Sequence, residues 1–388
     1  GAVTVTGNVA AGSSVTTGAG KDALTLSTTD GSTYNSGADD DTITTLFANL
    51  VASGVTDHVV NGGDGIDTLA TSDTAATTLT DNHFTNVTNM EKITLAATAG
   101  IDITTGGAFT SAFTSGVTIT ATALANEKVF VYDGGLYSGD TTIAITGTGS
   151  ADGAGQDATV TTNSGDDTVT LTYASWTGAT GAGGSMIVNT RAGDDTITIV
   201  HGDLGANTTD QAVTITAGTG ADTITLSTGE RGTGATANSI VIIAEGDSLE
   251  ASRDTITNFN VGDGTDQADV LDFATGAVGT LGTSTDQGVI LSHAITTGVA
   301  TFDDAATHAT ALIINTNNLA DVLLYLEANT NTNGVIAFEY DSTGNGVSDA
   351  TMVFHNGTVN SLVELVGVTG ASSIATTDTT DGLIGIGA

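Results

Sequence analysis

The chain has 388 residues, with 44 Asp and Glu, only 6 Lys and Arg, and a formal net charge of −38. So few cations exclude nucleic-acid binding through phosphate neutralisation, and an anionic membrane would repel such a surface. The lack of Cys excludes disulfides and thiol chemistry, and no apolar run reaches the ~18–20 residues of a membrane-spanning helix.

The composition favours short strands joined by turns. Of the 44 acidic residues, 36 are Asp, and the chain also holds 52 Gly and no Pro. Asp favours turns, whereas the abundant Thr and Val favour strands. Intrinsic disorder is the competing interpretation for so acidic a chain, but 39% apolar residues in clean alternation favour a folded, mainly β protein.

A strand-forming segment recurs along the first part of the chain, as Gly-Lys-Asp-Ala-Leu-Thr at 20–25 and Gly-Asp-Asp-Thr-Ile-Thr at 193–198. The aligned acids are Asp22, Asp41, Asp67, Asp167, Asp195, Asp222 and Asp254, at intervals of 19, 26, 100, 28, 27 and 32 residues. A unit of about 27 residues accommodates a rung of two or three short strands. Stacked rungs would superimpose the Gly-Asp corners, so residues 1–265 are predicted to form a β-solenoid-like body.

The interval of 100 residues departs from this period. Residues 75–150 still contain alternating segments such as 117–120 and 142–145, but they largely lack the Asp corners. Two interpretations remain open, namely rungs without the corner or an inserted β layer.

Residues 266–388 have a different pattern, which predicts a smaller C-terminal α+β unit. Apolar residues at helical spacing predict a helix over 318–329, with Asn318 as its N-cap. Strands are predicted at 335–340, 351–354 and 362–366.

The Gly-Asp corners are candidate calcium sites. Calcium binds 6–8 oxygens from carboxylates and carbonyls, and Gly allows a corner to turn its carbonyls inward. Residues 62–70 match the nonapeptide G-G-x-G-x-D-x-U-x throughout. The candidate ligands are Asp22, Asp39, Asp41, Gly62, Asp64, Asp67, Asp166, Asp167, Asp194, Asp195, Gly218, Asp222 and Asp254. Ordinary turns are the alternative, but repetition in one register without counter-charges favours calcium, and magnesium requires tighter octahedral geometry.

Two further stretches are rich in oxygen donors. Residues 341–349 resemble the start of a calcium loop, with Asp341, Asn345 and Asp349 as candidate ligands. The alternative is a hairpin turn that joins the flanking strands. The acids Asp263, Asp266, Asp269 and Asp272, at three-residue spacing, form the second stretch.

Catalytic patterns are weak, and we expect no enzyme activity. No H-E-x-x-H or G-x-S-x-G motif is present. A pair of carboxylates could serve a glycosidase on a β-helix, but Trp176 is the only Trp and aromatic residues total 4%.

The nonapeptide at 62–70 and its degenerate copies resemble the RTX repeats of calcium-dependent proteins exported by type I secretion. Residues 83–95 are similar to the F-x-N-V-x-x-x-E-K-I-T-L segments of RTX-type bacterial surface-layer proteins. Residues 254–273 resemble the end of an RTX array, and 338–369 resemble the region that holds an uncleaved secretion signal. The resemblance implies a secreted protein of the cell surface that binds Ca²⁺ and assembles with itself.

Only one nonapeptide is complete, and the copies lie about 27 residues apart rather than in tandem. This spacing favours a long, lattice-type body over a compact β-roll. The hypothesis is a structural surface-layer protein that assembles through calcium-bridged corners. The alternatives are an RTX adhesin or carbohydrate-binding segment, a secreted hydrolase and a halophilic cytosolic protein. The chain begins at Gly1 without Met, so an anchoring region, with cell-surface polysaccharide as its candidate partner, would lie outside these residues.

Overall fold

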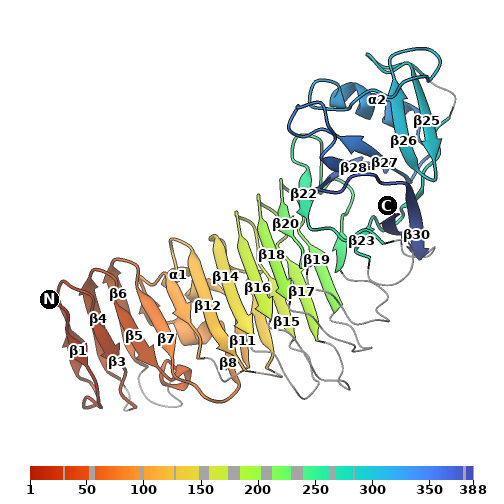
Figure 1. The fold of residues 1–388 in the computed structure, drawn as a ribbon. Helices are drawn as coiled ribbons and strands as arrows, with labels where there is room; N and C mark the ends of the chain where they lie inside the picture. The colour runs from red at the N-terminus through yellow and green to blue at the C-terminus, as the bar shows by residue number, and fades with distance from the viewer. Residues whose placement is uncertain are drawn as a thin grey trace. The chain divides into compact units, whose positions relative to one another are not determined.

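The computed structural model describes residues 1–28, 31–51, 57–96, 100–125, 128–147, 157–173, 184–201, 212–228, 239–262, 268–282, 285–378 and 382–387. The protein is mainly β and forms a β-solenoid, which confirms the predicted fold class (Figure 1). The chain divides into two compact units, one of Gly1–Arg191 with Val200–Gly202 and the other of Ala192–Ile199 with Asp203–Ala388.

The first unit is built from three sheets of parallel strands. One sheet contains β1 (Thr4–Val5), β3 (Ala23–Thr25), β5 (Thr42–Thr45), β7 (Thr68–Thr71), β10 (Lys92–Thr94), β12 (Val117–Leu124), β14 (Thr141–Gly147) and β16 (Thr168–Tyr173). The second contains β2 (Ser14–Thr16), β4 (Thr33–Ala38), β6 (Val59–Asp64) and β9 (Val87–Thr88). The third contains β8 (Thr77–Leu79), β11 (Ile101–Thr104), β13 (Phe130–Asp133), β15 (Ala158–Thr161) and β17 (Ser185–Asn189).

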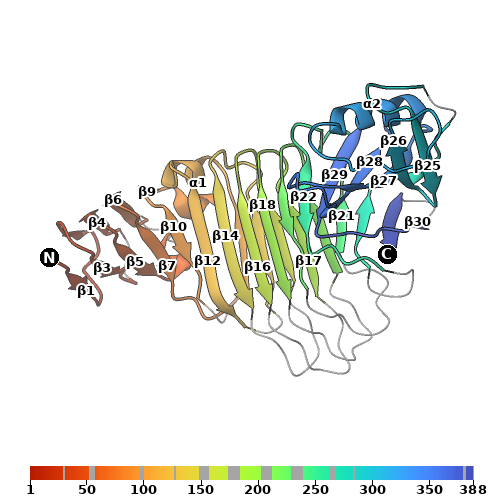
Figure 2. The ribbon, with the colours of Figure 1, turned by 45° about the horizontal axis from the view of Figure 1, so that its top comes forward.

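The first sheet keeps its register through the interval that lacks Asp corners. One buried aliphatic side chain per rung packs on the next, in the order Leu24, Ile43, Leu69, Ile93, Ile119, Ile143 and Val169. From Leu69 to Val169 the steps are 24, 26, 24 and 26 residues. Residues 75–150 therefore contain rungs of ordinary length, and Figure 2 shows β12, β14 and β16 side by side.

Short helices interrupt the rungs of the first unit at η1 (Phe47–Asn49), η2 (Asp81–Phe84) and α1 (Gly107–Ala112). Four buried aromatic side chains pack together around α1 and η2. The ring centroids of Phe84 and Phe109 are 4.9 Å apart, and those of Phe109 and Tyr137 are 5.1 Å apart, both edge to face. Phe113 packs 4.7 Å from Phe109. Such edge-to-face pairs add to the burial of the rings, so this cluster stabilises the rungs that lack an Asp corner.

The second unit combines rungs with a C-terminal α+β region. Its rung strands are β18 (Thr196–His201), β19 (Ala212–Thr216), β20 (Thr223–Thr225), β21 (Ser239–Ile242), β22 (Asp254–Thr257) and β23 (Val270–Asp272). The remaining elements are β24 (Ala277–Val278), β25 (Ser292–Thr296), β26 (Val299–Asp303), α2 (Leu319–Asn329), β27 (Gly334–Tyr340), β28 (Ala350–His355), β29 (Ser361–Val366), β30 (Ser373–Asp378) and β31 (Leu383–Gly387).

The C-terminal region contains the helix and the three strands that the sequence predicts. Strands β27, β28 and β29 form an antiparallel meander, and α2 packs on it through Val322 and Leu326 (Figure 2). Asn318 is the N-cap residue, but its side chain does not cap the helix. Its Oδ1 instead accepts the backbone N–H of Asn315 (2.8 Å), a local bond that competes with capping.

The boundary expected near residue 265 falls inside the second unit. Strand β22 pairs in parallel with β29, and β23 pairs antiparallel with β31. The last rungs of the solenoid therefore share their sheets with the C-terminal strands, so the change of sequence pattern does not mark a separation between compact units.

Candidate functional site

The seven aligned aspartates occupy one register position, two residues before the aliphatic core residue of their rung. All seven are buried, with exposed fractions of at most 2%. Buried carboxylates are costly unless they are hydrogen-bonded or neutralised, so their partners decide what the column can do.

In the first unit the carboxylates form a ladder of hydrogen bonds between rungs. The backbone N–H of Val3 donates to Oδ1 of Asp22 (2.6 Å). The N–H of Asp22 donates to Oδ1 of Asp41 (2.7 Å), and that of Asp41 donates to Oδ1 of Asp67 (2.8 Å). Each rung is thus joined to the next by the carboxylate as well as by its strands.

The ladder extends one step past the aligned aspartates and then stops. The N–H of Asp67 donates to Oε2 of Glu91 (2.7 Å), a residue that the search for Asp corners missed. The next two rungs carry Val117 and Thr141 at this position. The ladder resumes where the N–H of Thr141 donates to Oδ1 of Asp167 (2.6 Å). The interval without Asp corners is therefore an interruption of the ladder and not of the solenoid.

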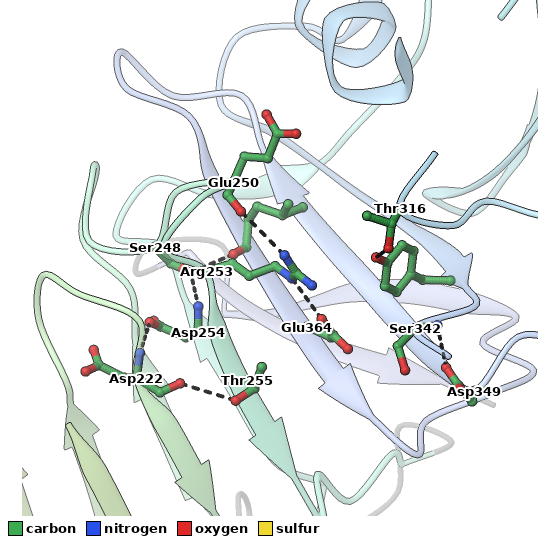
Figure 3. Close-up of polar contacts among 12 residues, drawn as sticks. Asp222, Ser248, Glu250, Arg253, Asp254, Thr255, Thr316, Ser342, Asp349 and Glu364 are labelled. Carbon is green, nitrogen blue, oxygen red and sulfur yellow. Dashed lines mark hydrogen bonds and ion pairs between the residues drawn. The ribbon is translucent and has the colours of Figure 1, made fainter. Parts of the chain in front are cut away.

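The second unit repeats the ladder and ends it with a serine (Figure 3). The N–H of Asp195 donates to Oδ1 of Asp222 (2.8 Å). The N–H of Asp222 donates to Oδ1 of Asp254 (3.2 Å), as Figure 3 shows. The N–H of Asp254 donates to Oγ of Ser248 (2.7 Å). The Ser248 hydroxyl then donates to the carbonyl of Leu362 in β29 (2.6 Å), so it occupies the place of a further aspartate.

Replacement of Ser248 by alanine tests this terminal step. The N–H of Asp254 would lose its acceptor in a fully buried place, so we expect the variant to lose about 1–3 kcal/mol of unfolding free energy. Urea unfolding followed by circular dichroism measures the loss. The matched change at the partly exposed Ser252 should leave the midpoint unchanged, and equal midpoints for both variants would contradict the capping role.

The second carboxylate oxygen distinguishes this ladder from an ordinary hydrogen-bond network. Oδ2 of Asp22, Asp41, Asp67, Asp222 and Asp254 is buried and has no hydrogen-bond partner among the described residues. A buried, ionised oxygen of this kind requires a proton or a cation. Such an oxygen is present at three levels of the ladder in the first unit and at two levels in the second.

The pKa values of the ladder reflect burial and mutual repulsion. Burial, with the neighbouring charges of Asp41 and Glu91, raises the pKa of Asp67 to about 6. Burial raises the pKa of Asp222 to about 6, and burial together with the charge of Asp222 raises that of Asp254 to about 8. Asp67, Asp222 and Asp254 thus hold protons more strongly than carboxylates in water, whereas the Thr17 side chain lowers the pKa of Asp22.

The other corner acids lie outside the column. Asp39, Asp64, Asp166 and Asp194 are exposed, in contrast to the ladder. Oδ1 of Asp194 accepts the N–H of Ala221 in the next rung (2.9 Å). A G-D-D corner therefore places one acid outside the solenoid and the next one inside, as the alternation of a strand requires.

Glycines of the corners allow the rungs to approach closely. A Cβ on Gly62 would lie 2.6 Å from Oδ2 of Asp67 and closer still to the carbonyl of Asn89. Gly218 has φ +99°, and Gly220 has φ +143°. A Cβ on Gly220 would overlap the carbonyl of Gly193 in the preceding rung, so these positions require glycine for the backbone approach.

The acids at three-residue spacing have different surroundings from one another. Asp269 is buried, and its two oxygens accept the N–H groups of Ser239 and Asn260 (2.8 Å each). Asp272 lies in β23 and accepts the N–H of Ala274 (2.8 Å). Asp263 and Asp266 lie outside the described residues.

Residues 341–349 form the connection between the antiparallel strands β27 and β28. Oδ1 of Asp341 accepts the N–H of Gly344 (2.7 Å) and Oδ2 that of Gly346 (2.7 Å). Burial opposes the ionised form of Asp341, but the backbone N–H groups together lower its pKa. Asn345 accepts from Val347 and Asp349 from Ser342, so this turn is held by its own polar side chains.

The donor chemistry of the ladder fits calcium better than a transition metal. Its donors are carboxylate and carbonyl oxygens, which hard cations prefer. In the part of the chain that the structure describes, no three acidic or histidine side chains converge into one group. An ion here would therefore depend on backbone carbonyls as well as on the ladder carboxylates.

Comparison with known protein families, curated proteins and solved structures finds no significant match for this chain. Among the described residues, no helix has the length and apolar character that crossing a membrane requires.

Proposed function

We propose that this protein is a structural component of an extracellular surface, with an acidic solenoid that is stabilised by calcium and assembles with further copies of itself. The supporting observation is the ladder of buried carboxylates in each unit. Among the described residues, Oδ2 lacks a hydrogen-bond partner at three levels of the first unit and two of the second. Like charges so close repel one another strongly at low dielectric. A cation between the rungs would convert this repulsion into attraction.

In this proposal, Oδ1 of Asp67 and of Asp222 still accepts a backbone N–H, and Oδ2 of each residue binds the ion. Backbone carbonyls would complete the shell. They can approach closely at Gly62, where a Cβ would overlap the carbonyl of Asn89, and at Gly218, which has φ +99°. Bound calcium would supply positive charge between rungs. The chain itself has only 6 Lys and Arg for its 44 acids, so it cannot supply that charge.

The exposed acids of the corners support a role in assembly. Asp64 and Asp166 lie on the outside of the rungs, where an ion could bridge two copies of the protein. A repetitive solenoid repeats such positions along its length, which multiplies weak contacts between copies.

Assembly in calcium tests the proposal directly. We expect purified protein in millimolar calcium to form ordered arrays in negative stain, and to return to a monomeric mass after chelation. Magnesium at equal ionic strength should support assembly less well. The Asp64→Asn/Asp166→Asn variant should fold like the parent but require more calcium to assemble. A monomer in calcium at every concentration would contradict the assembly, and an unchanged melting temperature in chelator would contradict the calcium.

A further inference from the structure

The second unit contains an apolar groove of about 340 Å³ that is distinct from the ladder. It lies between the segment before β22, helix α2 and the hairpin that joins β28 to β29. Phe354 and Leu362 form its buried floor. Leu249, Leu324 and Val359 line it with exposed fractions of 41%, 52% and 46%. Three of the large exposed hydrophobic side chains of the described chain thus meet in one place.

Helix α2 is apolar on two faces, and one of them borders the groove. Its buried face packs Val322 and Leu326 into the core. Its other side lines the groove with Ala320, Leu323 and Leu324, of which Leu323 also packs against the core, and with the charged Glu327. A helix that covers a core on one side normally presents a polar face to water. The apolar side that lines the groove is therefore suited to contact with another apolar surface.

The charges beside the groove are negative. Glu250 and Glu327 are exposed and belong to its lining. The nearby cation, Arg253, is engaged by Glu364 through Nε (2.8 Å) and lies over the ring of Tyr340 (5.8 Å to the centroid), as Figure 3 shows for the ion pair. The groove is thus apolar in its centre and anionic at its edge.

We propose that this groove binds a basic, amphipathic segment of another protein. Apolar side chains of that segment would occupy the space between Leu249, Leu324 and Val359, and its Lys or Arg side chains would pair with Glu250 and Glu327. Without bridging calcium, a second copy of this chain is disfavoured by its net charge of −38, and an anionic membrane is disfavoured for the same reason. This proposal does not depend on calcium or on self-assembly.

Binding of a model peptide tests the proposal. The probe is a fluorescein-labelled helical peptide of Leu and Lys, with the Leu residues on one face, and its control has Glu in place of each Lys. In chelator, fluorescence anisotropy should show binding of the basic peptide alone, weakened by salt. Leu324→Asn should weaken binding about tenfold, because it removes apolar contact without changing charge. Leu249→Asn tests the opposite wall, outside the helix.

Matched substitutions elsewhere on the surface distinguish binding in the groove from general attraction of a basic peptide to an acidic protein. Leu136→Asn removes an exposed leucine of the first unit and should leave the affinity unchanged. Glu327→Gln should weaken binding about threefold, and Asp304→Asn should not. Equal effects of Leu136→Asn and Leu324→Asn would overturn the proposal. So would a dimer, or binding to phosphatidylserine vesicles, that disappears in Leu324→Asn, since either result identifies a different occupant.

Discussion

In chelator, the second unit is expected to lose stability as the pH rises from about 7 to about 8. Burial, with the charge of Asp222, raises the pKa of Asp254 to about 8 in the folded protein, whereas an Asp side chain in the unfolded chain has its ordinary pKa of 3.8. In this window the folded state holds a proton that the unfolded state has released, so its advantage decreases as the pH rises. The contribution of Asp254 to the slope is at most about 1.4 kcal/mol per pH unit.

This pH window is the informative one because, at lower pH, other carboxylates and the buried histidines change the stability in opposite directions. The raised pKa values of Asp67 and Asp222 also favour the folded state at low pH. Burial lowers the pKa values of His293 and His355, so these groups favour the folded state as the pH rises toward 6.5. In the unfolded chain the histidines become neutral only about one pH unit above 6.5. Above about pH 7 the change caused by Asp254 therefore dominates.

Saturating calcium is expected to remove this loss of stability. An ion bound to Oδ2 of Asp254 favours the ionised carboxylate, so folding no longer takes up a proton there. Binding to the folded state also adds RT ln(1 + [L]/Kd) of stability for each site. Urea unfolding between pH 7 and 8, in chelator and in calcium, measures both effects. Parallel curves in the two conditions would show that the ladder binds protons and not calcium.

The sequence was sufficient to predict the register of the ladder. The alternation of apolar residues around Asp22, Asp167 and Asp222 identified the strands, and stacking of the aligned acids followed from the period. The helix at 318–329 and the three strands after it were also predictable, because each has a strong period of its own.

No acid was assigned to a side of the backbone from the sequence, although strand alternation contains that information. In Gly-Asp-Asp the second acid, Asp195, lies two residues before the buried Ile197 and is buried with it, whereas Asp194 is exposed. Glu91 was missed because the search required Asp, although Glu at that register position was a visible signal. Ser248 carried no local signal, since its role depends on Leu362, more than a hundred residues away in the chain. Contacts of this separation are set by tertiary packing.

Replacement of Asp254 separates the two roles of its carboxylate. Asparagine keeps Oδ1 as the acceptor for the N–H of Asp222 but removes the charge beside that residue. In chelator, we expect the stability of Asp254→Asn relative to the parent to increase as the pH rises from 6.5 to 8. Alanine also removes the acceptor, so Asp254→Ala should be less stable than Asp254→Asn by about 1–3 kcal/mol at every pH.

Calcium should reverse the order of Asp254→Asn and the parent. The parent gains the ion at this level, whereas asparagine offers a neutral donor and binds it more weakly. Asp286→Asn removes the same charge from an exposed position of the second unit and should follow the parent in both conditions. If Asp254→Asn and Asp286→Asn show the same pH dependence, the carboxylate of Asp254 is ionised without cost in the folded protein. The ladder would then be a turn-and-strand motif that needs neither proton nor ion.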